Sequence, residues 1–251
     1  MSADDSETLA GGRRVLVSLC TYNERENIER LIPRILAAAP QVEIVVVDDH
    51  SPDGTGEYAD ELSEADPRIH VMHRPQKLGL GVATLAALGY AIEHDYDVWL
   101  NMDADFSHSP EKVPELIARM QEADVAIGSR YVPGGGVEGW GLRRHLMSRS
   151  INWYTRLLLG LRTKDNSGAF RCYNLSRLRK LDLTRFRATG YAIQEELLYR
   201  CRQLGCTFVE IPITFSDREF GESKINQKEA VLAVWVIFRL ALDRVLHISV
   251  T

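Results

Sequence analysis

Asp103 and Asp105 place two carboxylates one residue apart, directly after the apolar run 98–102. A short apolar run of this kind predicts a buried strand. In a parallel sheet, the residues that follow such strands gather at the ligand-binding edge. Such carboxylates can bind a common divalent cation through oxygen ligands, and Mg²⁺ usually binds through one or two carboxylates plus substrate phosphates. The pair therefore predicts a divalent-metal site, and an acidic turn without metal is the alternative.

A second acidic pair, Asp48 and Asp49, follows the β-branched run 44–47, and residues 51–54 then supply a turn. Two interpretations of this pair remain open. The carboxylates could hydrogen-bond a ribose or a base, as acidic residues do in other nucleotide-binding sheets. They could instead cap a turn or a helix, which is a common role for aspartate.

Glycine motifs disfavour two other classes of nucleotide site. Gly79 and Gly81 precede a predicted helix, but Thr84 stands where a dinucleotide site has its third glycine. The sequence also lacks the glycine-rich lysine motif of P-loop proteins. These patterns therefore argue against a nicotinamide site and against a P-loop site.

The elements that must position these residues alternate along the first half of the chain. Apolar runs predict strands at 15–19, 44–47, 69–72, 98–102 and 125–127, and helices are predicted at 28–36, 56–65, 80–94 and 111–122. Further helices are predicted at 146–159, at 191–204 and from 227, with a strand at 208–213 that Pro212 places at a sheet edge. Alternating strands and helices indicate an α/β fold with a mainly parallel sheet. We expect a single domain, 13–251, after a disordered tail, 1–12.

Composition excludes some functions. The formal net charge of −5 over 251 residues argues against nucleic-acid binding, which requires a basic surface. The four cysteines lack zinc-site spacing, which fits free thiols in a reducing compartment. The polar, acidic residues 1–8 do not follow the order of a signal peptide, so we expect a cytoplasmic protein.

The apolar stretch 231–242, which Arg239 interrupts, falls short of the ~20 residues that a membrane-spanning helix needs. It predicts an amphipathic C-terminal helix at about 228–247. That helix could pack on the domain, or it could contact a membrane surface or a membrane-anchored partner. Basic residues also gather in the second half of the chain, and their grouping favours a phosphate-bearing acceptor. They are Arg130, Arg143, Arg144, Arg149, Arg218 and Lys224.

Several motifs follow one another in a specific order. They are Thr-Tyr-Asn-Glu-Arg-Glu-Asn at 21–27, Val-Val-Asp-Asp at 46–49, Ser-Pro-Asp-Gly at 51–54, Leu-Gly-Leu-Gly at 78–81, Met-Asp-Ala-Asp at 102–105, His-Ser-Pro at 108–110, Gly-Ser-Arg-Tyr at 128–131, Ser-Arg at 148–149, Ser-Gly-Ala-Phe-Arg at 167–171, Gly-Tyr at 190–191 and 218–224. Over residues 14–228 the chain thus resembles the short form of the polyprenyl-phosphate (dolichyl-phosphate) mannosyltransferases. These are inverting glycosyltransferases of family 2 with a GT-A (nucleotide-diphospho-sugar transferase) fold.

The resemblance implies a role for each matching residue. The nucleoside would be held by Tyr22, Glu24, Asp48 and Asp49. The metal, Mg²⁺ or Mn²⁺, would be bound by Asp103 and Asp105, with Ser107 able to approach it. Arg130 and Arg149 would act with the aspartates in catalysis by neutralising phosphate charge. The lipid phosphate would be held by Arg149, Arg218, Ser223 and Lys224.

The resemblance also implies the reaction: mannose passes from GDP-mannose to a polyprenyl or dolichyl phosphate with inversion. The acceptor is already anionic, so it needs no general base, in contrast to a hydroxyl acceptor. The enzyme would be peripheral on the cytoplasmic face of a membrane.

Three alternatives remain open. The first is a polyprenyl-phosphate glucosyltransferase with a UDP-sugar donor. The second is a phosphatase or phosphotransferase that uses one aspartate of the 103–105 pair as a nucleophile, although the ordered motifs do not fit that class. The third is a non-catalytic protein that only binds nucleotide or lipid.

Overall fold

The computed structural model describes residues 12–216 and 227–246. A seven-stranded sheet forms its centre, in the order β3-β2-β1-β4-β7-β5-β8. The strands are β1 (Val15–Thr21), β2 (Glu43–Asp48), β3 (Ile69–His73), β4 (Val98–Asp103), β5 (Val125–Ser129), β7 (Arg171–Asn174) and β8 (Phe208–Pro212). All pair in parallel except β7, which is antiparallel to both β4 and β5. The predicted mainly parallel α/β sheet is confirmed.

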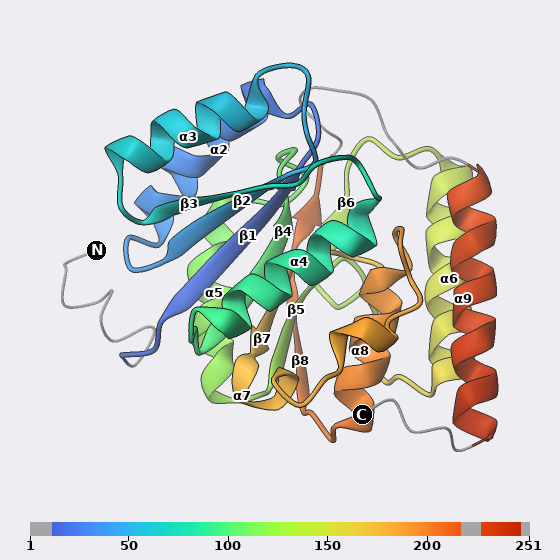
Figure 1. Ribbon diagram of the computed structural model, residues 1–251. Coiled ribbons are helices and arrows are strands. Elements are labelled where there is room, and N and C mark those ends of the chain that lie inside the picture. Colours follow the sequence, from blue (N-terminus) through green and yellow to red (C-terminus); the bar gives the residue numbers. More distant parts are fainter. Residues whose placement is uncertain (1–11, 217–226, 247–251) are drawn as a thin grey trace.

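The helices cover both faces of the sheet (Figure 1). They are α2 (Arg25–Ala38), α3 (Thr55–Ala65), α4 (Leu80–Glu93), α5 (Val113–Ala118), α6 (Leu142–Leu159), α7 (Leu175–Leu178), α8 (Ile193–Gln203) and α9 (Gln227–Val245), with 3₁₀ turns η1 (Pro110–Lys112), η2 (Arg119–Gln121) and η3 (Leu183–Arg185). Two short strands, β6 (Gly136–Val137) and β9 (Thr214–Phe215), pair separately.

Two apolar layers explain the continuous hydrophobic runs of the central strands. Val46 belongs to an apolar cluster on one face that also includes side chains of α2, α3 and α5. Its neighbours Val45 and Val47 belong to the cluster on the other face, which includes side chains of α4, α6, α8 and α9. Successive side chains of a strand point to opposite faces. A strand covered on both faces is therefore apolar throughout, and not at alternate positions.

The helices α6 and α9 lie side by side along one edge of the molecule, to the right in Figure 1. Arg244 Nη1 of α9 donates to the Leu158 carbonyl of α6 at 2.9 Å. Ile237 and Leu240 of α9 are buried, so one face of this helix packs on the domain. Within the described residues, no helix is both long enough and apolar enough to span a bilayer.

The sequence located most elements but not all of them. The C-terminal helix and the position of β8 at the sheet edge are confirmed. The predicted helix at 111–122 is wrong as a single element, because Pro114, which has no backbone N–H, stands near the start of α5 and separates it from η1. Strand β7 was not predicted. Of the expected disordered tail, residues 1–11 lie outside the described residues.

Candidate active site

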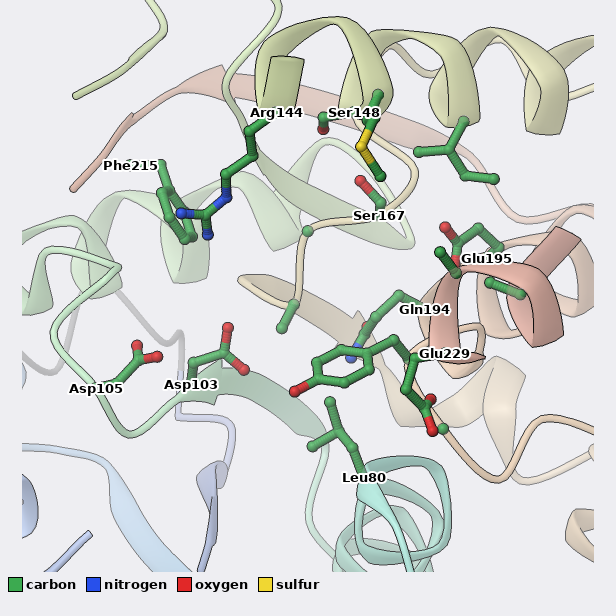
Figure 2. A pocket seen from close by; sticks show the side chains of 18 of the residues that line it. Leu80, Asp103, Asp105, Arg144, Ser148, Ser167, Gln194, Glu195, Phe215 and Glu229 are labelled. Carbon is green, nitrogen blue, oxygen red and sulfur yellow. The ribbon is translucent and has the colours of Figure 1, made fainter. Parts of the chain in front are cut away.

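A cavity of about 1500 Å³ opens at the carboxyl ends of β1, β2 and β4 and extends to α6, α8 and α9 (Figure 2). The topology explains its place, because ligands of parallel α/β sheets bind beyond these strand ends. Seven of the predicted site residues line it: Tyr22, Glu24, Asp49, Asp103, Asp105, Arg130 and Arg149. Asp48 and Ser107 are not part of its lining. Arg218, Ser223 and Lys224 lie outside the described residues.

The cavity end near β1 and β2 carries Asp49, whose Oδ1 accepts a hydrogen bond from Arg74 Nη1 at 2.6 Å. Both side chains are buried. Burial raises the pKa of Asp49 above its ordinary value, although the Arg74 guanidinium opposes this shift. Lys77 adds a second positive charge here, with its ammonium 3.8 Å from the centre of the Tyr22 ring. The sequence did not point to Arg74 or Lys77.

Asp48 faces away from this cavity and organises a turn. Its Oδ1 accepts hydrogen bonds from Ser51 Oγ at 2.5 Å and from Thr21 Oγ1 at 2.9 Å. Its Oδ2 accepts from the Ser51 N–H at 2.9 Å. Asp48 and Asp49 point in different directions because they are successive residues at a strand end. The geometry therefore fits a turn-building role for Asp48 and a ligand-facing role for Asp49.

Asp103 ends β4 with its side chain 33% exposed, and its Oδ2 lies 3.3 Å from Nε2 of the buried His108. Asp105 is 3% exposed, and its Oδ1 accepts from the Ser107 N–H at 3.1 Å. Phe106, which lies between Asp105 and Ser107, has a φ of 60°, a left-handed conformation that non-glycine residues seldom adopt. The tight turn brings both carboxylates to the cavity wall.

This donor set fits a hard divalent cation. Two carboxylates beside open cavity space suit Mg²⁺ or Mn²⁺, which can take further ligands from substrate phosphates and water. In the described part of the chain, no three His, Cys, Asp or Glu side chains group as a complete metal cage. Ser107 is buried and is not among the residues that line the cavity, so its predicted approach to the metal stays a prediction.

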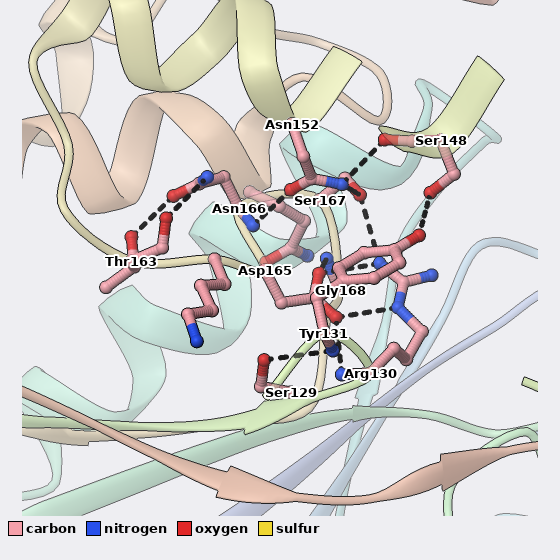
Figure 3. A network of polar contacts seen from close by, with 12 residues as sticks. Ser129, Arg130, Tyr131, Ser148, Asn152, Thr163, Asp165, Asn166, Ser167 and Gly168 are labelled. Carbon is pink, nitrogen blue, oxygen red and sulfur yellow. Dashed lines mark hydrogen bonds and ion pairs between the residues drawn. The ribbon is translucent and has the colours of Figure 1, made fainter. Parts of the chain in front are cut away.

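Arg130 is held by a buried carboxylate (Figure 3). Its Nε and Nη2 donate to Oδ2 and Oδ1 of Asp165 at 2.7 and 2.6 Å, and its backbone N–H donates to Oδ2 at 3.0 Å. Burial alone would raise the pKa of Asp165, but the Arg130 guanidinium outweighs it and lowers that pKa. A two-point ion pair of this kind fixes the orientation of the guanidinium. Arg130 therefore reaches the cavity as a rigid cation.

The same network ties α6 to the loop that carries Asp165. The Asn166 N–H donates to Asn152 Oδ1 at 2.6 Å, and Asn152 Nδ2 donates to Ser167 Oγ at 3.2 Å. The Tyr131 hydroxyl donates to Ser148 Oγ at 2.6 Å. These contacts position the first half of α6 relative to Arg130.

That half of α6 presents polar side chains to the cavity. Arg144 and Ser148 lie four residues apart, hence on one helix face, and both line the cavity together with Arg149. The Arg144 guanidinium lies 4.2 Å from the Trp140 ring centre. The sequence analysis gave a specific site role to Arg149, whereas it named Arg144 only among the grouped basic residues and Ser148 only as part of a motif. The helical spacing of 144 and 148 was a signal that could have found them.

The remaining cavity wall is apolar, and several of its side chains are exposed to solvent. From α6 it includes Leu146, Met147 and Trp153, which are 56%, 61% and 64% exposed. From α9 it includes Ala233 and Val234. One continuous cavity therefore joins carboxylates at the strand ends to an exposed hydrophobic wall.

The first turn of α8 supplies two buried polar residues that the sequence did not identify. Gln194 and Glu195 both line the cavity and are 2% and 3% exposed. Burial raises the pKa of Glu195 to about 7. A polar pair inside a helix otherwise in register for the core is the sequence signal that could have revealed them.

Comparisons with known proteins agree with this geometry. The family model for glycosyl transferase family 2 matches residues 17–182. Polyprenol monophosphomannose synthase of Mycolicibacterium smegmatis is 46% identical over 250 residues, which cover 97% of this chain and 94% of that protein. Undecaprenyl-phosphate mannosyltransferase of Micrococcus luteus is 43% identical over 213 residues, which cover 85% of this chain and 88% of that protein.

Solved structures show the fold. Glucosyl-3-phosphoglycerate synthase from Mycobacterium tuberculosis, in complex with Mn²⁺, UDP-glucose and phosphoglyceric acid, aligns with a TM-score of 0.71 at 18% identity. The alignment covers 96% of this chain and 84% of that one. The expected GT-A fold is confirmed, and so is the resemblance found in the motifs: the chain belongs to glycosyl transferase family 2.

Proposed function

We propose that the chain transfers mannose from GDP-mannose to a polyprenyl or dolichyl phosphate, with inversion, to give a β-linked product. Its two relatives at 46% and 43% identity are named for mannosyl transfer to such lipids. The observation that carries the proposal is the two-part cavity. Its carboxylates suit a nucleotide diphosphate with a metal ion, and its exposed apolar wall suits a prenyl chain.

The donor would occupy the end near β1, β2 and β4. Tyr22, Glu24 and Asp49 line the cavity just after β1 and β2 and can meet the nucleoside. Asp103 and Asp105 would hold Mg²⁺ or Mn²⁺ beside the diphosphate. A bound divalent ion supplies Lewis-acid stabilisation of charge on a departing nucleoside diphosphate. Glucosyl-3-phosphoglycerate synthase, which shares the fold, has been crystallised with Mn²⁺ and with Mg²⁺, which supports the choice of ions.

The acceptor phosphate would lie near Arg130, Arg144, Ser148 and Arg149. Guanidinium groups suit phosphate oxygens because their planar fork matches two acceptors. A phosphate monoester is anionic at neutral pH and attacks without deprotonation. These residues therefore position two anions close together and offset their repulsion, which are the main requirements of an in-line displacement.

The lipid acceptor implies a membrane surface next to α6 and α9. Exposed apolar side chains cover this side of the molecule: Leu142, Leu146, Met147, Trp153 and Leu157 on α6, and Val231, Leu232, Val234, Trp235, Phe238, Leu242 and Val245 on α9. Exposed arginines accompany them, including Arg143, Arg156 and Arg239. Apolar side chains beside cations are typical of helices that lie in the interface of anionic membranes. We propose peripheral binding through this face, and a membrane-anchored partner on the same face is the alternative outcome of a binding test.

The experiment is a transfer assay with purified protein, GDP-mannose, Mg²⁺ and a polyprenyl phosphate, with and without a chelator. Chelator-sensitive formation of lipid-linked mannose is the expected result. Transfer from UDP-glucose in place of GDP-mannose would reassign the donor while keeping the site. No transfer from either donor, in the presence of membranes, would overturn the proposal and favour a binding protein.

A further inference from the structure

The side-chain amide of Gln194 is buried at the cavity wall with its hydrogen-bonding capacity unused. The residue is 2% exposed and lines the cavity. Among the residues that the structure describes, neither Nε2 nor Oε1 of this amide has a hydrogen-bond partner. Figure 2 shows the amide directed into the space beside Asp103. An unpaired buried amide is costly, so a ligand that supplies partners gains affinity from it.

The fold holds Gln194 beside the predicted reaction centre. Arg171 Nη1 of β7 donates to the backbone carbonyl of Gln194 at 2.5 Å. Arg171 pairs in register with Asn101 of β4, two residues before Asp103. The first turn of α8 is therefore fixed against the end of the strand that carries the predicted metal site. The nucleoside-facing residues Tyr22 and Asp49 belong instead to the ends of β1 and β2.

The chemistry of an amide limits the kinds of ligand group that Gln194 can bind. It offers two N–H donors and a carbonyl acceptor without a formal charge. Vicinal sugar hydroxyls, each both donor and acceptor, complement it, whereas a phosphate is better matched by the arginines of α6 and by Arg130. Between a diphosphate at Asp103 and an acceptor phosphate at those arginines, the group to be placed is the sugar.

We infer that Gln194 binds hydroxyl groups of the hexose that is transferred and thereby contributes to the choice of sugar. This inference rests on the proposed function. It assigns a specificity-determining contact to a residue that is distinct from the metal, nucleoside and phosphate ligands.

The first test is Gln194→Met, which keeps the length of the side chain and removes the amide. We expect kcat/KM for GDP-mannose to fall about 10- to 100-fold, while the dissociation constant of GDP alone changes less than about twofold. The melting temperature should not fall, because the amide makes no protein hydrogen bond that the methionine would lose. A lower melting temperature with unchanged kcat/KM would make Gln194 a structural residue and overturn the inference.

A series of monodeoxy GDP-mannose analogues identifies the hydroxyl. In the wild type, removal of the hydroxyl that contacts Gln194 should lower kcat/KM at least about tenfold. In Gln194→Met, the same analogue and GDP-mannose should be used equally well, because the two changes remove one shared interaction. If the variant discriminates against every analogue as the wild type does, the inference is wrong.

Glu196→Gln is the matched control, since it changes a buried neighbour in the same turn. The Glu196 carboxylate accepts from Arg200 Nη2 at 2.7 Å and from the backbone N–H groups of Arg187 and Ala188 at 2.9 and 2.8 Å. This variant should lower the melting temperature and keep the preference among deoxy donors. If the wild type uses another nucleotide sugar, the proposed function fails. Gln194 is then tested with that donor, by comparing the affinity of the nucleotide sugar with that of the bare nucleotide.

Discussion

The two ends of the cavity are built in different ways. At the donor end, Asp103 is the last residue of β4, and Asp49 and Asp105 follow β2 and β4 within two residues, so the sheet itself fixes their positions. At the acceptor end, Arg130 owes its position to Asp165, 35 residues away in the sequence. The donor end carries carboxylates that the strand ends position, whereas the acceptor end combines a polar network with an exposed apolar wall.

This difference matches two kinds of substrate. A soluble nucleotide sugar can be enclosed by the ends of a sheet, because all of its recognition is polar and local. A lipid phosphate must be reached while its chain remains in a bilayer, so its phosphate needs fixed cations next to a surface that tolerates hydrocarbon. Exposed apolar area on a protein surface favours aggregation unless it binds a partner or a membrane. Here it is concentrated on α6 and α9.

The largest effect should come from the donor end. We expect Asp105→Ala to lower turnover by about 10³-fold or more, because charge stabilisation on the leaving diphosphate contributes several kcal/mol to such reactions. The far-ultraviolet circular dichroism spectrum should stay that of the wild type. A well-folded variant with near-normal activity would contradict the assignment of a metal site to the donor end.

The acceptor end should respond to Asp165→Asn mainly through stability. The substitution leaves the Arg130 guanidinium, 7% exposed, without its anionic partner. Breaking a buried ion pair from one side costs about 3–5 kcal/mol. Urea denaturation would measure this loss. An unchanged free energy of unfolding would show that Arg130 does not depend on Asp165 for its position. The acceptor end would then, like the donor end, be positioned by residues close in the sequence.

Stability should depend on pH through Glu195, which lines the cavity from the first turn of α8. Its folded-state pKa of about 7 lies above the ordinary 4.5, so the folded protein holds a proton that the unfolded chain releases between these values. Its contribution to stability is therefore full below pH 4.5 and is lost as the pH rises through 7. The charged groups that act on it are Arg171, Asp165 and Arg130.

Glu195→Gln should remove this dependence. Compared with the wild type, the variant should gain on the order of 2 kcal/mol in the free energy of unfolding at pH 8 and little at pH 4. Denaturation curves at the two pH values provide the measurement. An equal effect at both would show that the carboxyl does not titrate in this range.

The smallest effect is expected on the apolar wall. The exposed tryptophans Trp153 and Trp235, 64% and 55% exposed, should be replaceable by serine with no loss of stability. The double variant should sediment less with anionic vesicles and should use a long-chain polyprenyl phosphate about tenfold less efficiently. Activity with a short, water-soluble prenyl phosphate should stay within about twofold of the wild type. Unaltered sedimentation would contradict membrane contact through this face.

The sequence determined much of the donor end. Apolar runs followed by acidic residues specified which side chains meet at the strand ends, because parallel strands share one carboxyl edge. Motif order specified the family. Where the sequence left two interpretations of Asp48 and Asp49, the alternation of side chains at the end of β2 assigned them different directions.

Tertiary structure decided the rest. Strand β7, with the sequence Arg-Cys-Tyr-Asn, lacks the pattern of a core strand and is inserted antiparallel between β4 and β5 only because those strands offer it backbone partners. The pairs Arg74–Asp49, Arg130–Asp165 and Arg171–Gln194 join residues 25, 35 and 23 positions apart. No local pattern encodes such contacts, since a charged residue looks the same in sequence whether it meets solvent, a partner or a ligand. Its role depends on which segments pack against it, and that is a property of the whole fold.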